Sequence, residues 1–388
     1  MRRASTRAEL RDTELGYSLW IDDEQELWLS GLTAADLSES GVAVEAELEH
    51  QAQEVYGYLA LLLREPGLNL QDVTRVVEYV TPEALPEYPE LAELRRGLFG
   101  KWPPVTSTVV VPRLLRAGAL IQVEAVATRR GSAPVVTPRA VDTQGRALAR
   151  RVGDFMYLST QLPVQPTGGA VVAPGDVGGQ SRQIFENAAE VLRAEGLTLP
   201  DVVKIVSFAT PAASANYGQT REVRGTYLAP RYAASTALFQ PQTEHPDALV
   251  QVDFIASAAP KVVVNPGWTR YEGLAYVPAI KSGNQLFVSG FGSLNGTTGA
   301  VEHVGDLVAQ TRNVYEKILR VVETAGGTAA NVVKLQEYVV PRAMPWYAEV
   351  APLRREHFGT PPPAGTAIVC EALVQPEMLI EVDAWVVL

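Results

Sequence analysis

Three carboxylates recur at matching places, each in an apolar segment of alternating pattern. Glu124 lies in LIQVEAVA, Asp253 in LVQVDFIA and Asp383 in LIEVDAWV, at separations of 129 and 130 residues. A carboxyl group in an otherwise apolar strand can have a raised pKa and exchange a proton near neutral pH. We therefore take all three as candidate acid/base residues, Glu124 and Asp383 first. The alternative is a structural role, in which each carboxylate caps a strand or pairs with a basic neighbour, and the sequence leaves both open.

The same two separations recur at other positions. ELWLSG, FMYLST and QLFVSG place Ser30, Ser159 and Ser289 at 129 and 130 residues apart, and LQDVTRVVEYVTP has two later counterparts at the same spacing. Collinear matches with one period indicate tandem copies of one domain. The sequence predicts three domains, at 1–130, 145–257 and 268–388. The segments 128–145 and 258–272 are expected to be surface linkers, because they contain Pro and Gly among polar residues.

Each copy has the periodicity of an α+β domain. An apolar strand ending in a Ser-Gly type turn precedes a long amphipathic helix, at 44–63, 177–194 and 306–325. The VVEYVTP-type strand follows, then a second helix, at 86–99, 216–228 and 346–358, and two closing strands. This order predicts a mixed sheet with two helices on one face. The other apolar face needs a partner, which is most simply the sheet of another copy.

Composition and the lack of certain motifs disfavour several classes of protein. With 33 basic and 44 acidic residues the net charge is −11, which disfavours binding to nucleic acid. There is no apolar stretch of about 18 residues and no signal-peptide core at the start, so we expect a cytoplasmic protein that does not bind membranes. The four histidines show no metal-binding spacing, and no nucleotide-binding motif occurs, so we expect neither metal nor cofactor. The one cysteine, Cys370, is expected to be a small buried side chain.

The third copy resembles the RidA/YjgF (reactive intermediate deaminase) family. The resemblance rests on YVPAIKSGNQLFVSG, NVVKLQEYVV, FGTPPPAGTAIV and IEVDAWVVL, and the second copy matches nearly as well through GGQSRQIFENAAEVLRAEG and DVVKIVSFAT. The first copy matches more loosely. The resemblance implies a chorismate-mutase-like fold and a trimeric arrangement, with sheets around a central barrel, helices outside and a ligand cleft at each boundary. Fusion would make this chain an intramolecular pseudo-trimer that binds a small molecule, and whether it is a monomer or a dimer in solution stays open.

Members that hydrolyse enamines and imines hold the substrate carboxylate with an arginine in a P-A-R-S-T-like segment. The matching segments here are P-V-T-S-T, Y-A-A-S-T and P-P-A-G-T, which place Thr106, Ala234 and Ala364 at that position. We therefore do not expect the standard deaminase activity. The substrate either lacks the usual carboxylate or is held by another basic residue, such as Arg113, Arg116 or Arg221.

Other family positions are retained in part. The late-strand carboxylate, which orients or activates a water, matches Glu124, Asp253 and Asp383. The remaining matches are the cleft aromatic at Tyr17 and Tyr276, the ligand-facing glycine at Gly31 and Gly290, and the small hydroxyl at Thr108, Thr236 and Thr366. The second copy has Arg146 and Thr160 at the aromatic and glycine positions. By this pattern the second copy is expected to be scaffold.

Three functions remain open. The first is a RidA-like enzyme of a specialised biosynthetic or catabolic pathway, which hydrolyses, tautomerises or cyclises a small carbonyl, imine or enamine compound by carboxylate acid/base catalysis. The second is a chorismatase-like hydrolase, since those enzymes are also fused RidA-like units. The third is a non-catalytic protein that binds small ligands or acts like a chaperone. An endoribonuclease role is disfavoured by the acidic balance.

Overall fold

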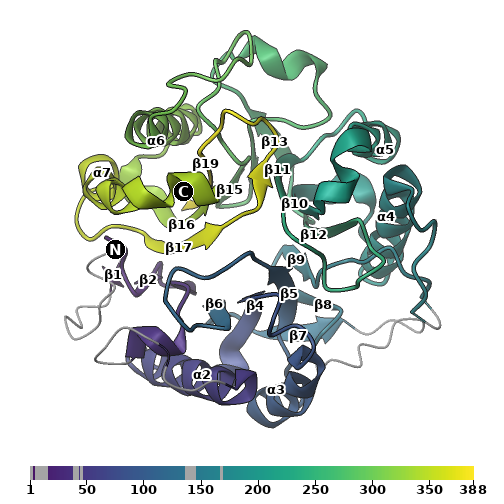
Figure 1. Ribbon diagram of the computed structural model, residues 1–388, viewed down its shortest axis with the longest axis vertical. Helices are drawn as coiled ribbons and strands as arrows, with labels where there is room; N and C mark the ends of the chain where they lie inside the picture. Colours follow the sequence, from purple (N-terminus) through teal and green to yellow (C-terminus); the bar gives the residue numbers. More distant parts are fainter. Residues whose placement is uncertain (1–2, 5–15, 38–42, 44–46, 136–145, 167–168) are drawn as a thin grey trace.

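Three α+β units lie around one centre in the computed structural model, which describes residues 3–4, 16–37, 43, 47–135, 146–166 and 169–388. Each unit turns its sheet toward the middle and its two helices outward (Figure 1). The predicted fold class of three tandem α+β units is therefore confirmed. Within the described residues, no helix has the length and apolar character that crossing a membrane requires.

The elements follow one order in all three units. The first unit comprises β2 (Trp20–Asp22), β3 (Glu26–Leu29), α2 (Leu48–Arg64), β4 (Val73–Val80), α3 (Leu91–Phe99), β5 (Val105–Val110) and β6 (Ile121–Thr128). The second comprises β8 (Ala149–Val152), β9 (Phe155–Leu158), α4 (Val177–Arg193), β10 (Val202–Ala209), α5 (Gln219–Leu228), β11 (Ala234–Phe239) and β12 (Val250–Ser257). The third comprises β14 (Ala279–Ser282), β15 (Gln285–Val288), α6 (Leu307–Thr324), β16 (Val332–Val339), α7 (Ala351–Phe358), β17 (Ala364–Val369) and β19 (Ile380–Val387).

The predicted helices are close to those observed. The second long helix, expected at 177–194, spans 177–193, whereas the predicted start of the first, at residue 44, lies outside the described residues. The shorter helices begin later than expected, because 3-10 turns such as Pro341–Val350 take up their first part. Prolines suit the start of such a turn, where their missing N–H groups have no intrahelical partner.

The sheets are mixed, as predicted. In the first unit the strand order is β2-β3-β6-β4-β5, with β4 and β5 parallel and the other neighbours antiparallel, and the other units repeat it. Four short strands extend the sheets: β1 (Arg3–Ala4), β7 (Ser132–Val135), β13 (Lys261–Val264) and β18 (Ala372–Leu373). β7 and β13 lie in segments expected to be surface linkers, and both keep exposed residues, such as Val262 and Val263, while also forming strands. Each pairs with the strand that follows it, β8 or β14, and so joins the sheet of the next unit.

The units meet through one repeated junction. A backbone bridge joins the edge of each unit to the next, at Val105 with Ala147, Ala234 with Val277, and Ala364 with Ser18. A serine hydroxyl reinforces each bridge by accepting from the edge strand's N–H at 2.8 Å and donating at 2.6 Å to a carbonyl of its own unit. These hydroxyls belong to Ser159, Ser289 and Ser30.

The inner faces of the three sheets form a common core. Its side chains come from all three units and include Trp28, Tyr157, Phe287 and Trp385. The rings of Trp28 and Trp385 lie 5.1 Å apart between centroids. The second apolar face of each sheet therefore packs against the other units, as expected. The structure shows three sheets joined at their edges, and their closure into one continuous barrel stays a prediction.

Helices α3 and α7 are fastened to their sheets by buried ion pairs. Arg95 on α3 meets Glu78 on β4 with Nη2 to Oε2 at 2.5 Å, and their side chains are 1% and 0% exposed. Tyr56 and Tyr88 also donate hydrogen bonds to Glu78. Burial alone would raise the pKa of Glu78, but Arg95 and the two hydroxyls outweigh it, so the pKa lies below the ordinary value. The carboxylate is therefore charged and fully paired in the folded protein.

We expect Arg95→Met to lower the free energy of unfolding at pH 7 by about 3–5 kcal/mol, because it leaves Glu78 buried without a counter-ion. The folded-state pKa of Glu78 is depressed, so the pair stabilises the fold above the ordinary value of 4.5, and this stabilisation is lost as the pH falls through the folded-state pKa. Urea unfolding should therefore show a smaller gap between wild type and variant at low pH than at pH 7.

Arg96→Met is the matched control, because Arg96 is the next residue of the same helix and its side chain is 47% exposed in its pair with Glu93. An exposed pair contributes less than about 1 kcal/mol. Equal losses in the two variants would contradict the assignment of the buried pair as the fastening.

Candidate functional site

The three recurring carboxylates lie in the interior, where side chains of the neighbouring unit bind them. Glu124 faces Lys334 Nζ at 2.9 Å and accepts from Gln336 Nε2 at 2.7 Å and from the hydroxyl of Thr366. All of these partners belong to the third unit. The arrangement is the structural alternative foreseen for these residues, namely a carboxylate paired with a basic neighbour.

Asp383 follows the same scheme, whereas Asp253 makes no ion pair among the described residues and accepts hydrogen bonds from one hydroxyl of the first unit and one of its own unit. Asp383 meets Lys204 Nζ at 2.5 Å and accepts from Thr236 Oγ1 at 2.7 Å, both in the second unit. Asp253 accepts from Ser107 and Thr160 hydroxyls at 2.6 Å each, and burial raises its pKa while Arg75 opposes the rise. The hydroxyls of Thr366 and Thr236 therefore act inside the junctions rather than in an open cleft.

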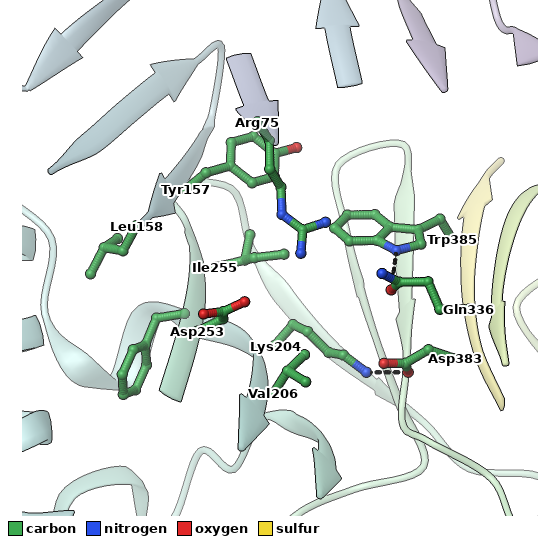
Figure 2. Close-up of a pocket in the computed structure, with 11 residues that line it drawn as sticks. Arg75, Tyr157, Leu158, Lys204, Val206, Asp253, Ile255, Gln336, Asp383 and Trp385 are labelled. Atoms are coloured by element: carbon green, nitrogen blue, oxygen red, sulfur yellow. Dashed lines mark hydrogen bonds and ion pairs between the residues drawn. The ribbon is translucent and has the colours of Figure 1, made fainter. Parts of the chain in front are cut away.

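The cavity beside these residues is too small for a substrate. Figure 2 shows it between Arg75, Lys204, Asp253, Asp383 and other side chains of all three units. Its volume is about 10 Å³, which is roughly the room that one water needs. A catalytic role for Glu124, Asp253 and Asp383 stays a prediction, but their closed surroundings favour a role in holding the units together.

Strand pairing corrects two sequence correspondences in the first unit. Ser107 pairs with Val77 as Thr236 pairs with Val206, whereas Thr108 lies one residue further along and pairs with Glu78. Ser107, not Thr108, is therefore the counterpart of Thr236 and Thr366. By the same register, Val105 rather than Thr106 corresponds to Ala234 and Ala364, because each is the first residue of its strand.

The boundary between the third and first units is filled by Tyr17. A Cβ atom on Gly365 would lie 1.9 Å from Cδ1 of Tyr17, so the ring occupies the space above that glycine. The Tyr17 hydroxyl is 2.9 Å from that of Tyr347, and Arg354 lies 4.2 Å from the ring centroid. Gly31 donates its N–H to the Gly365 carbonyl oxygen at 3.2 Å, which is a strand contact. This boundary is closed by its own side chains.

The boundary between the first and second units is lined by an ion pair of the second unit, which also contacts the first unit through Thr108. Arg146 lies where Tyr17 and Tyr276 lie in the other units, and its Nη1 contacts both oxygens of Glu244 at 3.0 Å and the Thr108 hydroxyl at 3.3 Å. Gln251 donates to the Thr108 carbonyl oxygen at 2.6 Å. The polar groups at this boundary therefore bind one another.

The boundary between the second and third units differs from both. Tyr276 is only partly buried, and its hydroxyl is 3.5 Å from Nη2 of Arg270. Arg224 Nη1 donates to the Ser235 hydroxyl at 3.1 Å. In the part of the chain that the structure describes, Arg224 Nε is buried with no hydrogen-bond partner. This guanidinium nitrogen is thus left able to bind another group.

Glu381 supplies a titratable group at the same boundary. Its Oε1 would lie 2.1 Å from a Cβ on Gly290, so the carboxyl sits directly against that glycine. Burial, together with the charge of Asp383, raises the pKa of Glu381 to about 8, against the opposing effects of a hydrogen bond from the Ala237 backbone, Lys204 and Arg270. The group is therefore largely protonated at neutral pH, and it can release or take up a proton nearby.

Sequence reasoning missed Glu381, although a signal was present. The strand LIEVDAWV carries two carboxylates, and the first stands where the other units have Gln122 and Gln251. Only the second carboxylate, Asp383, has a carboxylate at the matching position of both other units. Because Glu381 and Asp383 are two residues apart on one strand, both lie on the same face of the sheet.

A groove of about 550 Å³ lies on the outside of this boundary. It runs between α5 and the segment that leads to Tyr276, and its lining includes Arg221, Gly225, Gly273 and Ala275. Arg221 donates to the Gly273 carbonyl oxygen and so spans the two units. Arg116, by contrast, binds Asp36 at 2.6 Å within the first unit, and Arg113 is exposed.

Two further kinds of site, a reactive cysteine and a metal centre, find no support among the described residues. Cys370 is fully buried, as expected, and burial raises its thiol pKa. Among the described residues, no three His, Cys, Asp or Glu side chains gather in a way that could hold a metal ion.

Comparison with known proteins agrees with the repeats. The family model described as "Endoribonuclease L-PSP" matches residues 141–258 and 272–388. The 3-aminoacrylate deaminase RutC of Acinetobacter baylyi is 34% identical over 123 residues, which are 32% of this chain and 94% of that protein. A RutC family protein of Pyrococcus horikoshii is 35% identical over 109 residues, or 28% of this chain and 83% of that protein.

Among solved structures, the match to a chorismatase covers 81% of this chain and 93% of the chorismatase chain, with a TM-score of 0.54 and 13% sequence identity. That likeness concerns the fold alone. The family model, in contrast, matches two of the three units and more than half of the residues. The chain therefore belongs to the endoribonuclease L-PSP family, that of the RidA/YjgF proteins, as a member with repeated domains.

Proposed function

We propose that this protein is an enzyme that acts on a small imine, enamine or carbonyl compound at the boundary between its second and third units, with Glu381 as the acid/base residue. The observation that carries the proposal is the contrast among the three units. Glu381 can exchange a proton near neutral pH, whereas Gln122 and Gln251 at the matching positions cannot.

The surroundings of Glu381 fit proton transfer. In its protonated form it can protonate an imine nitrogen or an enamine carbon, and the resulting carboxylate can then take a proton from a water that attacks the C=N carbon. Addition of water and loss of ammonia leave a carbonyl product. Burial raises the pKa of Tyr276, so its hydroxyl stays neutral and can donate a hydrogen bond to the substrate.

The other two boundaries support the same choice by contrast. Tyr17 fills one, and the pair of Arg146 with Glu244, both of the second unit, lines the other, so a substrate would have to displace packed or charged side chains at both. The second unit, which was expected to be scaffold, contributes Ser235 and Arg224 to the proposed site. Among the relatives, RutC bears the name of a deaminase of 3-aminoacrylate, an enamine, and this likeness supports the chemical class.

Two alternatives have less support. The chorismatase likeness at 13% identity extends to the fold but brings no matched site residue. A protein that only binds ligands would not need a carboxyl with a pKa near 8 at a position where the other two units have glutamine. Loss or retention of turnover in a Glu381 variant separates the last alternative from an enzyme.

Glu381→Gln should lower the rate of imine or enamine hydrolysis by about a hundredfold or more, because it removes the proton donor and acceptor while keeping the shape. Ammonia release from a panel of imines and enamines formed in the assay is the measurement. Glu356→Gln is the control, since Glu356 is an exposed partner of Arg312 on the outside of the same unit.

Glu124→Gln provides the opposing test. It changes a carboxylate that binds Lys334 at another junction, so it should reduce stability and leave turnover per folded molecule nearly unchanged. If turnover fell with Glu124→Gln and survived in Glu381→Gln, the acid/base assignment would pass to the residue chosen from the sequence.

The pH dependence of kcat/KM should report Glu381. The protonated form acts first, so kcat/KM should be highest below pH 8 and fall as the pH rises through about 8. Asp383→Asn removes a negative charge that raises this pKa and leaves the charge of Lys204 unbalanced, and both effects shift the alkaline limb to lower pH. If the alkaline limb of the kcat/KM profile stayed at the same pH in Asp383→Asn, a group other than Glu381 would control that profile.

A further inference from the structure

The three units place an arginine at the same position but give it different partners. Arg95, Arg354 and Arg224 lie on the second helix of their units, at separations of 129 and 130 residues. Their exposed fractions are 1%, 0% and 9%, so all three guanidinium groups are buried. A buried cation is costly unless an anion compensates it.

In the first and third units a glutamate supplies that anion. Arg95 uses its Nε and Nη2, at 3.1 and 2.5 Å, to hold the two oxygens of Glu78. Arg354 binds Glu337 through the same two nitrogens at 2.8 and 2.5 Å. This edge of the guanidinium group matches the two oxygens of a carboxylate.

In the second unit the glutamate is replaced by Ser207. Phe185 likewise stands where the other units have Tyr56 and Tyr315, which donate to the glutamates. Arg224 makes no ion pair in the described part of the chain, and its Nε, on the edge that binds carboxylate in the other units, is buried without a partner. The chain thus keeps the guanidinium group and lacks its carboxylate.

The vacant edge lies at the boundary that holds Glu381. At the corresponding place in the third unit, Tyr347 connects Glu337 to Tyr17 of the first unit, at 2.7 and 2.9 Å, so this network reaches the neighbouring unit. Tyr276 is the counterpart of Tyr17, and the charges of Arg270, Glu381 and Arg224 all act on the pKa of its hydroxyl. A ligand carboxylate paired with Arg224 would therefore lie at the same boundary as the proposed acid/base group.

We propose that Arg224 binds the carboxylate of the substrate, taking the place of the missing family arginine through the edge that Glu78 and Glu337 occupy on its counterparts. The proposal rests on the function proposed above, and it adds that the substrate is a small carboxylate compound. The site is specific to this boundary, because Arg95 and Arg354 are already neutralised.

Ser207→Glu gives the sharpest test, because it restores the internal partner and leaves Arg224 in place. Titration of the full chain with pyruvate should show binding at least about tenfold weaker in this variant, and also in Arg224→Met. The melting temperature of Ser207→Glu should rise, because the buried guanidinium group gains a counter-ion. Arg193→Met, an exposed arginine on α4, should bind pyruvate like wild type, and neutral pyruvamide should bind wild type and variants equally.

Three results would overturn the inference: no saturable binding of pyruvate to wild type, unchanged pyruvate affinity in Ser207→Glu, or equal weakening by Arg193→Met. Failure of this inference is distinguishable from failure of the proposed function. If Glu381→Gln abolished turnover while Arg224→Met left the KM of carboxylate substrates unchanged, only the assignment of Arg224 would fail. If pyruvate binding required Arg224 but no compound of the imine and enamine panel were turned over, only the proposed reaction would fail.

Discussion

The arrangement of the whole molecule depends on how the exposed edge of each parallel strand pair is covered. The unpaired N–H and C=O groups of β5, β11 and β17 would attract other strands, so each edge has to be covered. The next unit covers it with a backbone bridge and a serine hydroxyl that accepts from the edge at 2.8 Å. Because this contact is used three times, the units turn back on themselves and no junction of this kind is left open among the described residues.

Covalent fusion lets three equivalent boundaries carry different side chains. A trimer of identical subunits would repeat one boundary, whereas here a tyrosine fills the first, an arginine paired with a glutamate of its own unit lines the second, and an arginine nitrogen without a partner lies at the third. The scaffold tolerates this because the backbone bridge and its serine recur at every junction. Side chains in the outer part of each boundary can therefore differ while this contact stays the same.

The sequence was sufficient for the architecture, whereas the site residues it favours stay a prediction, and one cause explains both. The architecture follows from what recurs, such as Ser30, Ser159 and Ser289, whose spacing predicted the three units. A search for recurrence also selected Glu124, Asp253 and Asp383, each of which has a partner in a neighbouring unit more than a hundred residues away in the chain. Sequence alone could not show that Lys334 reaches Glu124. The groups now proposed to act, Glu381 and Arg224, are conspicuous through a difference among the units.

Ser18 is tied to Pro362, 344 residues away, by a hydrogen bond from its hydroxyl at 2.6 Å, and its N–H donates to the Pro363 carbonyl oxygen at 3.0 Å. Protein synthesis proceeds from the N-terminus at about 5–20 residues per second, so the first unit waits roughly 20–70 s for the strand that covers it. Its core can form earlier, but one flank stays without a partner throughout that interval. During that interval the uncovered flank of a nascent chain can pair with a second nascent chain. If two such chains exchanged their third units, the bridge between Ser18 and Ala364 would form between the chains instead of within one.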